Sequence, residues 1–182
     1  MIRNATLDDA PRIAEIHVCG WRYAYRGLIS DNELFSKRQV HKSQINIQNK
    51  IENGDRLFIY EDESDNIIKA YSFHGKSRDG DKKDEYEIYA IYVQPEFTRM
   101  NIGSILLNEI ENQAKRDCCD ELLIWVLDKN EKGKSFYWKN GFEEDGKTKL
   151  VENWNQIEVR MRKFLTPASI LKSSSSAKQA KC

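Results

Sequence analysis

A short loop between a predicted strand and a predicted helix carries the clearest chemical signal in this sequence. The loop and the first helical turn are formed by seven consecutive residues: Thr98, Arg99, Met100, Asn101, Ile102, Gly103 and Ser104. The first N–H groups of a helix have no partner within the helix and carry partial positive charge, so they bind anions. The segment therefore predicts an anion site, typical of a phosphate-bearing ligand that lies along the preceding strand.

The elements that position this loop follow from hydrophobic periodicity. Alternating or continuous apolar residues predict strands at 1–6, 56–60, 67–74, 85–94, 122–127, 142–149 and 156–164. Apolar residues three and four apart predict a first helix after Thr6 and further helices at about 31–52, 102–116 and 130–139. The order β-α-α-β-β-β-α-β-α-β-β indicates an α/β domain built on a mixed α+β sheet.

Turn and cap signals mark the ends of several elements. Residues 6–9 resemble a capping box, residues 62–66 form a polar hairpin turn, and Asn140-Gly141 is typical of a helix C-cap. The charged segment 75–84 is predicted to be a solvated loop. The serine- and lysine-rich segment 166–182 is predicted to be a disordered tail outside a single domain at 1–165.

The composition excludes several classes of function. The chain has 182 residues, 40% of them hydrophobic, and 29 basic residues balance 29 acidic ones, so no nucleic-acid partner is indicated. No apolar run approaches the roughly 20 residues that span a membrane. The four cysteines lack CxxC spacing and the three histidines lack ligand spacing, so no metal is expected. These features favour a cytoplasmic protein.

Three segments together resemble the GNAT superfamily of acetyl-CoA-dependent N-acetyltransferases, and the resemblance covers about residues 1–165. Segment 93–107 is similar to the acetyl-CoA signature of a strand, a Q/R-x-x-G-x-G/A loop and a helix. Segment 130–142 is similar to N-x-x-A-x-x-F-Y-x-x-x-G-F, and segment 16–27 to a W-R-x-A-Y-x-G helix. The resemblance implies the GNAT fold, with a splayed pair of central strands.

The match departs from the family pattern in the loop and in the second segment. Thr98 stands where the family usually has Gln or Arg, and Asn101 stands where it has its first glycine. Asparagine tolerates a left-handed backbone better than other non-glycine residues, so the loop geometry is expected to survive. Gly103 keeps a position where a side chain would block a pyrophosphate. Gly133 replaces the usual alanine, which is expected to matter little.

The resemblance implies acetyl-CoA as co-substrate. Its pantetheine arm would lie beside the backbone of Ile91, Tyr92 and Val93, and the N–H of Tyr92 or Val93 would donate to the thioester oxygen. The pyrophosphate would bind the amides of residues 99–104, where Arg99 adds positive charge and the Ser104 hydroxyl can donate. No metal is implied.

The resemblance also implies the groups that move protons. Tyr137 is the candidate general acid, because a phenol can protonate a departing thiolate; the alternative is a packed aromatic residue. Asn130 would cap the helix of Tyr137 and orient the cofactor arm, or serve only as a cap. Glu87 is the candidate base that deprotonates the amine, with Glu85 on the same face as its competitor. The alternative for both is a solvated acid at a strand end.

Aromatic residues near the N terminus are candidates for the acceptor pocket. In relatives this region binds the acceptor, so Trp21 and Tyr25 would form its walls, together with Glu85, and contact a cation through their ring faces. The alternative for Trp21 is a core position on the helical stripe.

Two functions follow from the resemblance. The first is acetyl transfer from acetyl-CoA to a primary amine by direct attack in a ternary complex. The acceptor would be a small molecule or a peptide. The second is a non-catalytic acyl-CoA-binding sensor or scaffold, which Thr98 and Asn101 suggest because a degraded loop can bind without efficient chemistry. The partners expected include neither nucleic acid nor membrane, and a homodimer is left open.

Overall fold

A seven-stranded sheet organises the molecule. The computed structural model of the chain describes residues 1–79 and 84–165. The strands are β1 (Ile2–Asn4), β2 (Arg56–Asp62), β3 (Ile67–Lys76), β4 (Glu85–Val93), β5 (Glu121–Leu127), β6 (Glu143–Val151) and β7 (Gln156–Phe164). Their order in the sheet is β1-β2-β3-β4-β5-β7-β6, and only the β4–β5 pair is parallel. The expected α/β fold with a mixed sheet is confirmed.

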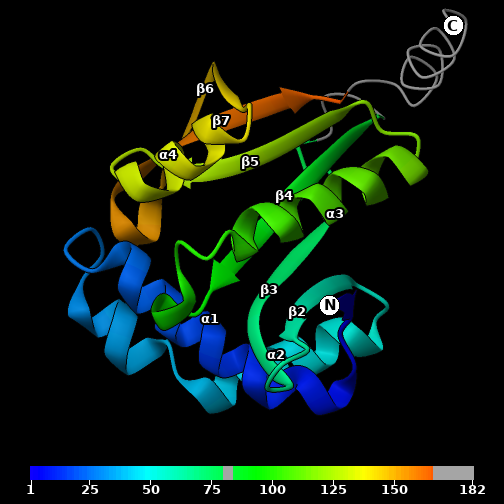
Figure 1. Ribbon diagram of the computed structural model, residues 1–182. Helices are drawn as coiled ribbons and strands as arrows, with labels where there is room; N and C mark the ends of the chain where they lie inside the picture. The colour runs from blue at the N-terminus through cyan, green and yellow to red at the C-terminus, as the bar shows by residue number, and fades with distance from the viewer. Residues whose placement is uncertain (80–83, 166–182) are drawn as a thin grey trace, which may run out of the picture.

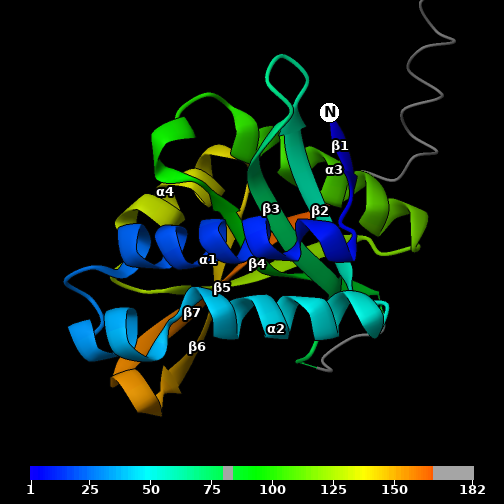
Figure 2. The same ribbon diagram turned by 90° about the horizontal axis from the view of Figure 1, so that it is seen from below.

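Helices cover the sheet on both faces. The α-helices are α1 (Ala10–Tyr25), α2 (Val40–Glu52), α3 (Ile102–Arg116) and α4 (Glu131–Lys139), with short helical turns η1 (Leu7–Asp9), η2 (Asn32–Lys37), η3 (Pro95–Phe97) and η4 (Glu152–Trp154). Figure 1 shows α3 crossing one face of the sheet, and Figure 2 shows α1 and α2 side by side across the other. The crossover through α3 joins the two parallel strands, as the element order predicts.

The two central strands, β4 and β5, pair with each other along only part of their length. β4 and β5 pair only from Glu85 to Ile88 and from Glu121 to Ile124, and beyond this they diverge (Figure 1). On its other side β4 stays paired with β3 as far as Val93, although the register shifts so that Tyr89 is an extra residue opposite Phe73 and His74. Such a bulge bends the strand and increases its twist. The expected splayed pair is thus present, with one open edge of β4.

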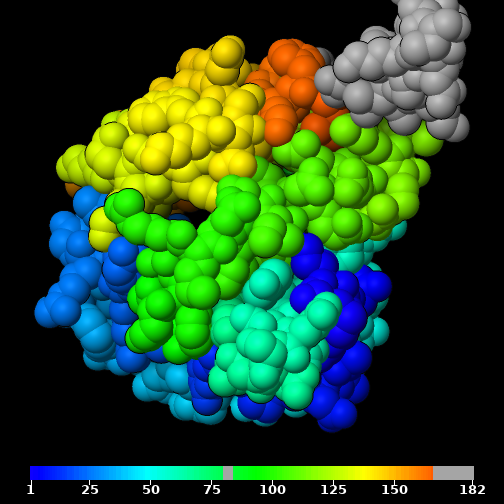
Figure 3. Space-filling view, in the orientation of Figure 1, coloured from blue at the N-terminus to red at the C-terminus, as the bar shows by residue number. Residues whose placement is uncertain are grey.

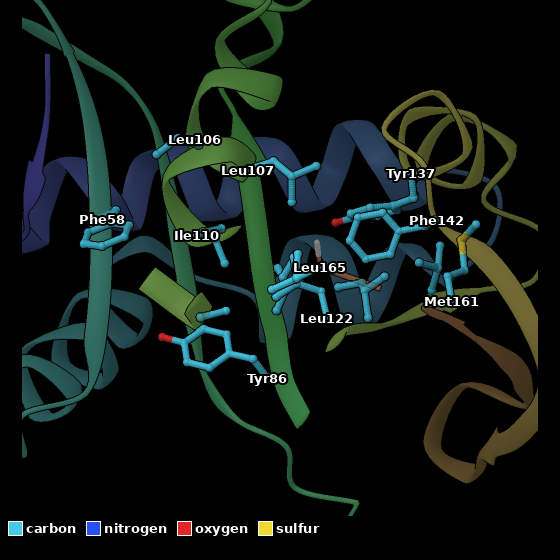
Figure 4. Packing of buried hydrophobic residues seen from close by; sticks show 14 of the residues in the cluster. Phe58, Tyr86, Leu106, Leu107, Ile110, Leu122, Tyr137, Phe142, Met161 and Leu165 are labelled. Atoms are coloured by element: carbon cyan, nitrogen blue, oxygen red, sulfur yellow. The ribbon is translucent and has the colours of Figure 1, made fainter. Parts of the chain in front are cut away.

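Two apolar cores hold the helices to the sheet. The larger cluster lies under α3 and includes Phe58, Tyr86, Ile110, Leu122 and Phe142 (Figure 4). The second packs α1 against the opposite face, through residues such as Ile13 and Ile59. On α3 the buried stripe differs in detail from the sequence pattern, because Leu107 is buried while Ile105 is 39% exposed.

The sequence prediction of one helix over 31–52 is wrong. The π-helical turn η2 ends at Lys37, and α2 begins only at Val40. Arg38 and Gln39 between them have extended backbones, with ψ of 91° and 144°. The apolar stripe is weak here, so packing of each piece against α1 decides the geometry.

The predicted local signals are confirmed where the structure describes them. Asp9 accepts from the Thr6 amide at 2.7 Å in a capping box, and Gly141 ends α4 with a φ of 85°. β3 continues to Lys76, so the loop predicted at 75–84 begins later. Residues 80–83 of that loop, and the tail predicted at 166–182, lie outside the described residues.

Candidate functional site

The loop before α3 has the geometry of an anion site. Arg99 and Asn101 have left-handed backbones, with φ of 65° and 62°, which turn the chain sharply into the helix. Within residues 1–79 and 84–165, no acceptor is found for the amides of Ile102, Gly103 and Ser104, and the first helical bond runs from Ile105 N–H to Asn101 O at 3.1 Å. Three N–H groups are therefore available to an anion.

Thr98 and Asn101, the two departures in this loop, are accommodated. The left-handed residue that a glycine would usually supply is Asn101, which adopts this conformation at modest cost. The Thr98 hydroxyl donates to the carbonyl of Pro95 at 2.8 Å and so stabilises the turn η3. The loop is therefore not degraded in its backbone.

Two glycines of the site lie at close contacts between elements. A Cβ on Gly103 would lie 3.1 Å from the ring of Phe136 and 3.7 Å from Val93, so this glycine allows α3 to approach α4 and β4 closely. A Cβ on Gly133 would lie 2.7 Å from the Asn130 amide nitrogen. Alanine at 133 would therefore require the end of the Asn130 side chain to shift.

The open edge of β4 presents backbone groups to the splayed region. The Gln94 amide donates to Lys69 O of β3 at 2.9 Å. Because antiparallel pairs alternate, the amide of Tyr92 also faces β3, whereas the amides of Ile91 and Val93 face away from it. No β5 residue pairs with this edge. Of the two amides considered as oxyanion donors, the register favours that of Val93.

Tyr137 lies in the large core cluster at the edge of the splayed region. It is only 6% exposed, and its ring centre is 5.1 Å from that of Phe136 and 5.3 Å from that of Phe142. Figure 4 shows its hydroxyl pointing away from Met161. In the described part of the chain this hydroxyl has no hydrogen-bond partner, although a buried tyrosine usually has one. Burial raises the pKa of Tyr137, so the phenol stays protonated.

Asn130 is the N-cap of α4. Its side-chain oxygen accepts from the Gly133 amide at 3.1 Å, and the residue is 8% exposed. This capping bond fixes the start of the helix that carries Tyr137. Figure 3 shows a hollow in the surface between the yellow residues of α4 and the green residues around the start of α3. The loop amides and α4 therefore border one depression.

Aromatic rings from distant segments gather at the end of α1. The Trp21 ring centre lies 4.8 Å from that of Tyr25 and 5.2 Å from that of Trp154. The Tyr25 and Tyr92 hydroxyls are 3.3 Å apart, which links this group to the open part of β4. Gly20 makes the approach possible, because a Cβ there would lie 2.6 Å from the Tyr92 ring. The structure thus brings Trp21 and Tyr25 together beside β4.

Trp21 also meets the alternative expectation of a core position. It is half-buried and packs against the cluster of Ile29, Leu34 and Leu127. Trp21 therefore helps to hold the end of α1 in place as well as contacting the aromatic group.

The two acidic candidates are engaged by arginines. Glu87 is 1% exposed and accepts from the Arg78 side chain and, at 2.9 Å, from the Arg78 amide. Glu85 is equally buried and accepts from Arg162 at 3.4 Å. It lies where β4 and β5 are still paired, so the structure does not bring Glu85 together with Trp21 and Tyr25.

Several residues of the site were missed by sequence reasoning. The Tyr71 hydroxyl lies 2.6 Å from His17 Nδ1, and the Tyr71 ring stacks with that of Tyr92 at 5.9 Å. Burial, helped by the charges of Arg38 and Lys50, lowers the pKa of His17 to about 3, so His17 is neutral. Tyr71 could have been placed by strand alternation, whereas the contacts of His17 depend on the tertiary fold.

Metal ligands and membrane-spanning helices were considered for the described residues. Among residues 1–79 and 84–165, no group of three or more His, Cys, Asp or Glu side chains is arranged to hold a metal ion. No helix in that part of the chain has the length and apolar character needed to cross a membrane.

A helix start with free amides, a sheet opened between parallel strands and a buried phenol are the features of this site, and comparison with known proteins gives its class. The model of the acetyltransferase (GNAT) family matches residues 21–142. The chain is 27% identical over 158 residues to the spermidine N(1)-acetyltransferase of Thermoplasma acidophilum, covering 83% of this chain and 94% of that protein.

Solved structures agree on the fold. The PaiA N-acetyltransferase of Thermoplasma acidophilum, in complex with coenzyme A, matches with a TM-score of 0.74 and 23% identity, covering 90% of this chain and 98% of that one. The YncA protein of Salmonella typhimurium, with its cofactor acetyl-CoA, matches with a TM-score of 0.66 and 17% identity, covering 91% and 94%. The chain belongs to the GNAT acetyltransferase family, and it is an N-acetyltransferase.

Proposed function

We propose that the protein transfers the acetyl group of acetyl-CoA to a primary amine by direct attack within a ternary complex. The observation that carries this proposal is the protonated hydroxyl of Tyr137, which has no partner within the described residues; its helix, α4, contacts the start of α3 through Phe136. Relatives of the same family are solved with coenzyme A and with acetyl-CoA, which supports the choice of acyl donor.

The chain's own groups fit acetyl-CoA. Bound acetyl-CoA supplies the acetyl group as a thioester that an amine can attack. The amides of Ile102, Gly103 and Ser104 bind its phosphates, and the Arg99 side chain and Ser104 hydroxyl add to them. The open edge of β4, through Ile91 and Val93, holds the extended arm as an added strand. Asn130 fixes α4 beside it.

Each proton and electron pair then has a defined destination. The Val93 amide donates to the carbonyl oxygen while the amine nitrogen forms its bond to the carbonyl carbon. As the carbon–sulfur bond breaks, Tyr137 gives its proton to the leaving sulfur, so free coenzyme A thiol results. The attacking nitrogen gives its proton to water, and the phenolate of Tyr137 recovers one from solvent. The products are an N-acetylated amine and the free thiol.

We also propose that the amine reaches the thioester past Trp21 and Tyr25, whose rings lie beside the open part of β4. The relative from Thermoplasma acidophilum is named for its action on spermidine, so spermidine is one acceptor to examine. The aromatic faces can contact an ammonium group before it is deprotonated.

The role of Glu87 gives a separate prediction. Because Arg78 already occupies the Glu87 carboxylate, we propose that water accepts the proton of the amine and that Glu87 holds Arg78. Glu87→Gln should lower kcat/KM less than about tenfold, below the 10²–10⁴-fold contribution typical of a general base. Glu85→Gln is the matched control. A loss above about 100-fold with a shifted acid limb of the pH profile would make Glu87 the base.

Thiol release from acetyl-CoA tests the function as a whole. The panel includes spermidine, amino acids and their amides, a peptide and an aminoglycoside, and calorimetry measures acetyl-CoA binding in parallel. We expect binding together with turnover on at least one amine. Tight binding with no turnover would favour the non-catalytic sensor or scaffold, and no binding would contradict both functions.

A further inference from the structure

Arg38 occupies a position at the acceptor side of the site that the transfer reaction does not explain. It lies in the extended break between η2 and α2, and its guanidinium carbon is 3.6 Å from the centre of the Trp21 ring. The same Trp21 ring packs against Tyr25, whose hydroxyl is 3.3 Å from that of Tyr92. Arg38 therefore borders the aromatic group through which the amine is proposed to enter.

No anion of the described chain neutralises Arg38. Its side chain makes no ion pair or hydrogen bond within residues 1–79 and 84–165, although it is half-buried. Two carboxylates, those of Glu33 and Glu158, are near enough to influence the pKa values of groups in this region, but each already has a lysine partner. Glu33 is paired with Lys37, and Glu158 lies 3.2 Å from Lys149. By contrast, Arg3 contacts the carboxylate of Asp9 at 2.7 Å.

The phenols and the imidazole near Arg38 are neutral. Burial raises the pKa values of Tyr25 and Tyr71, so both are protonated phenols, and the low pKa of His17 leaves its ring uncharged. The positive charge of Arg38 opposes the rise in pKa of both tyrosines, so Arg38 lies within electrostatic reach of their hydroxyls. A guanidinium beside hydroxyl donors is an arrangement that binds a carboxylate.

We infer that Arg38 binds a carboxylate of the acceptor and so determines specificity, making amines that carry a carboxylate, such as amino acids, the substrate class. This inference rests on the proposed acetyl transfer. The stacked contact with Trp21 holds the guanidinium in one orientation, which lowers the entropy cost of binding. A polyamine would instead bring a second ammonium toward an unpaired cation, which is repulsive.

The test compares each amino acid with its own carboxamide. The amino acids carry the amine either on the α carbon or on a more distant carbon. The wild type should use the acid at least about tenfold better in kcat/KM, the size of one charge-assisted hydrogen bond. Arg38→Gln should abolish this ratio by raising KM for the acid, while kcat for the amide and KM for acetyl-CoA stay unchanged. Arg38→Lys should restore part of it. Arg26→Gln, at an exposed arginine directly after α1, should behave as wild type.

Several outcomes would overturn the assignment. They are a wild type that prefers spermidine or the amides, an Arg38→Gln enzyme that loses acids and amides equally, and an Arg26→Gln enzyme that shows the same change as Arg38→Gln. Turnover with spermidine or amides alone would leave the transfer reaction in place and reject only the role of Arg38. If no amine is acetylated, the transfer reaction fails first. Calorimetry with coenzyme A present then decides: acid-selective binding lost in Arg38→Gln supports the role, and equal binding of acid and amide rejects it.

Discussion

Replacing Tyr137 with phenylalanine is expected to lower kcat for acetyl transfer by about 100- to 1,000-fold, within the range measured for general acids. The substitution removes one oxygen atom that has no partner within the described residues. The leaving thiolate then lacks a proton donor, whereas the packing of the ring against Phe136 and Phe142 is kept. Steady-state thiol release at saturating acetyl-CoA measures the effect, and thermal unfolding should show a melting temperature at or above that of the wild type.

Tyr86 offers a matched control for the loss of a phenol. It is fully buried in the same core cluster, but its hydroxyl lies 2.9 Å from His74 Nδ1 and 3.3 Å from Arg56. Tyr86→Phe should therefore cost about 1–3 kcal/mol of unfolding free energy, because it leaves a buried nitrogen of His74 without its partner. Its kcat should stay near that of the wild type. The two variants thus separate catalysis from stability.

The pH profile gives an independent readout of Tyr137. Burial raises the pKa of this phenol above its ordinary value, so the proton-donating form is present at every pH below that raised pKa. The wild-type kcat should therefore not fall between about pH 8 and pH 10, where an ordinary phenol with a pKa near 10 would begin to ionise. A Tyr137→Phe enzyme with normal kcat would contradict the general-acid role, as would a wild-type kcat that falls across this range.

The order of elements and the position of the anion loop were predictable from sequence because both depend on local signals. Alternating Tyr, Ile and Val residues specify β4, and the apolar spacing of Ile102, Leu106 and Ile110 specifies α3. The left-handed turn at Asn101 was also expected, because few residue types tolerate that conformation. These features need no knowledge of what lies across the sheet.

The rest of the site depends on contacts between distant segments. The extra residue Tyr89 decides which amides of β4 point toward the gap between β4 and β5. A bulge cannot be recognised in an alternating sequence, so these amides could not be assigned from sequence. The ion pair between Glu87 and Arg78 forms across a turn, so Glu87 could not be distinguished from a free acid. The break at Arg38 splits a weakly amphipathic stretch only because both parts pack on α1.

The site combines groups that stabilise the fold with groups that the fold leaves unsatisfied. Gly103, Asn130 and Gly20 satisfy packing or capping needs, and each brings one element of the site into position. The amides at the start of α3, the Tyr137 hydroxyl and the Arg38 guanidinium instead lack partners within the described residues. Polar groups that the fold leaves without partners are available to a ligand, as is typical of a binding site.

Asn101→Val is expected to weaken acetyl-CoA binding by about 10- to 100-fold, the equivalent of the 1–3 kcal/mol that a strained backbone conformation costs. Asn101 has a φ of 62° at the N-cap of α3, and a β-branched side chain disfavours that conformation strongly. The loop should then relax to an extended backbone, which turns the amides of Ile102 to Ser104 away from the phosphates. Calorimetric titration with acetyl-CoA measures the change.

Two matched variants decide whether the left-handed turn is responsible for this loss. Asn101→Gly keeps a residue that adopts a positive φ freely, so affinity should be retained even though the asparagine side chain is gone. Met100→Val places the same β-branched residue one position earlier, where the side chain is 56% exposed and the backbone is not left-handed, so binding should also be retained. Normal binding by Asn101→Val would show that the phosphates do not depend on this turn. Loss of binding in Asn101→Gly would mean that the asparagine side chain itself contacts the ligand.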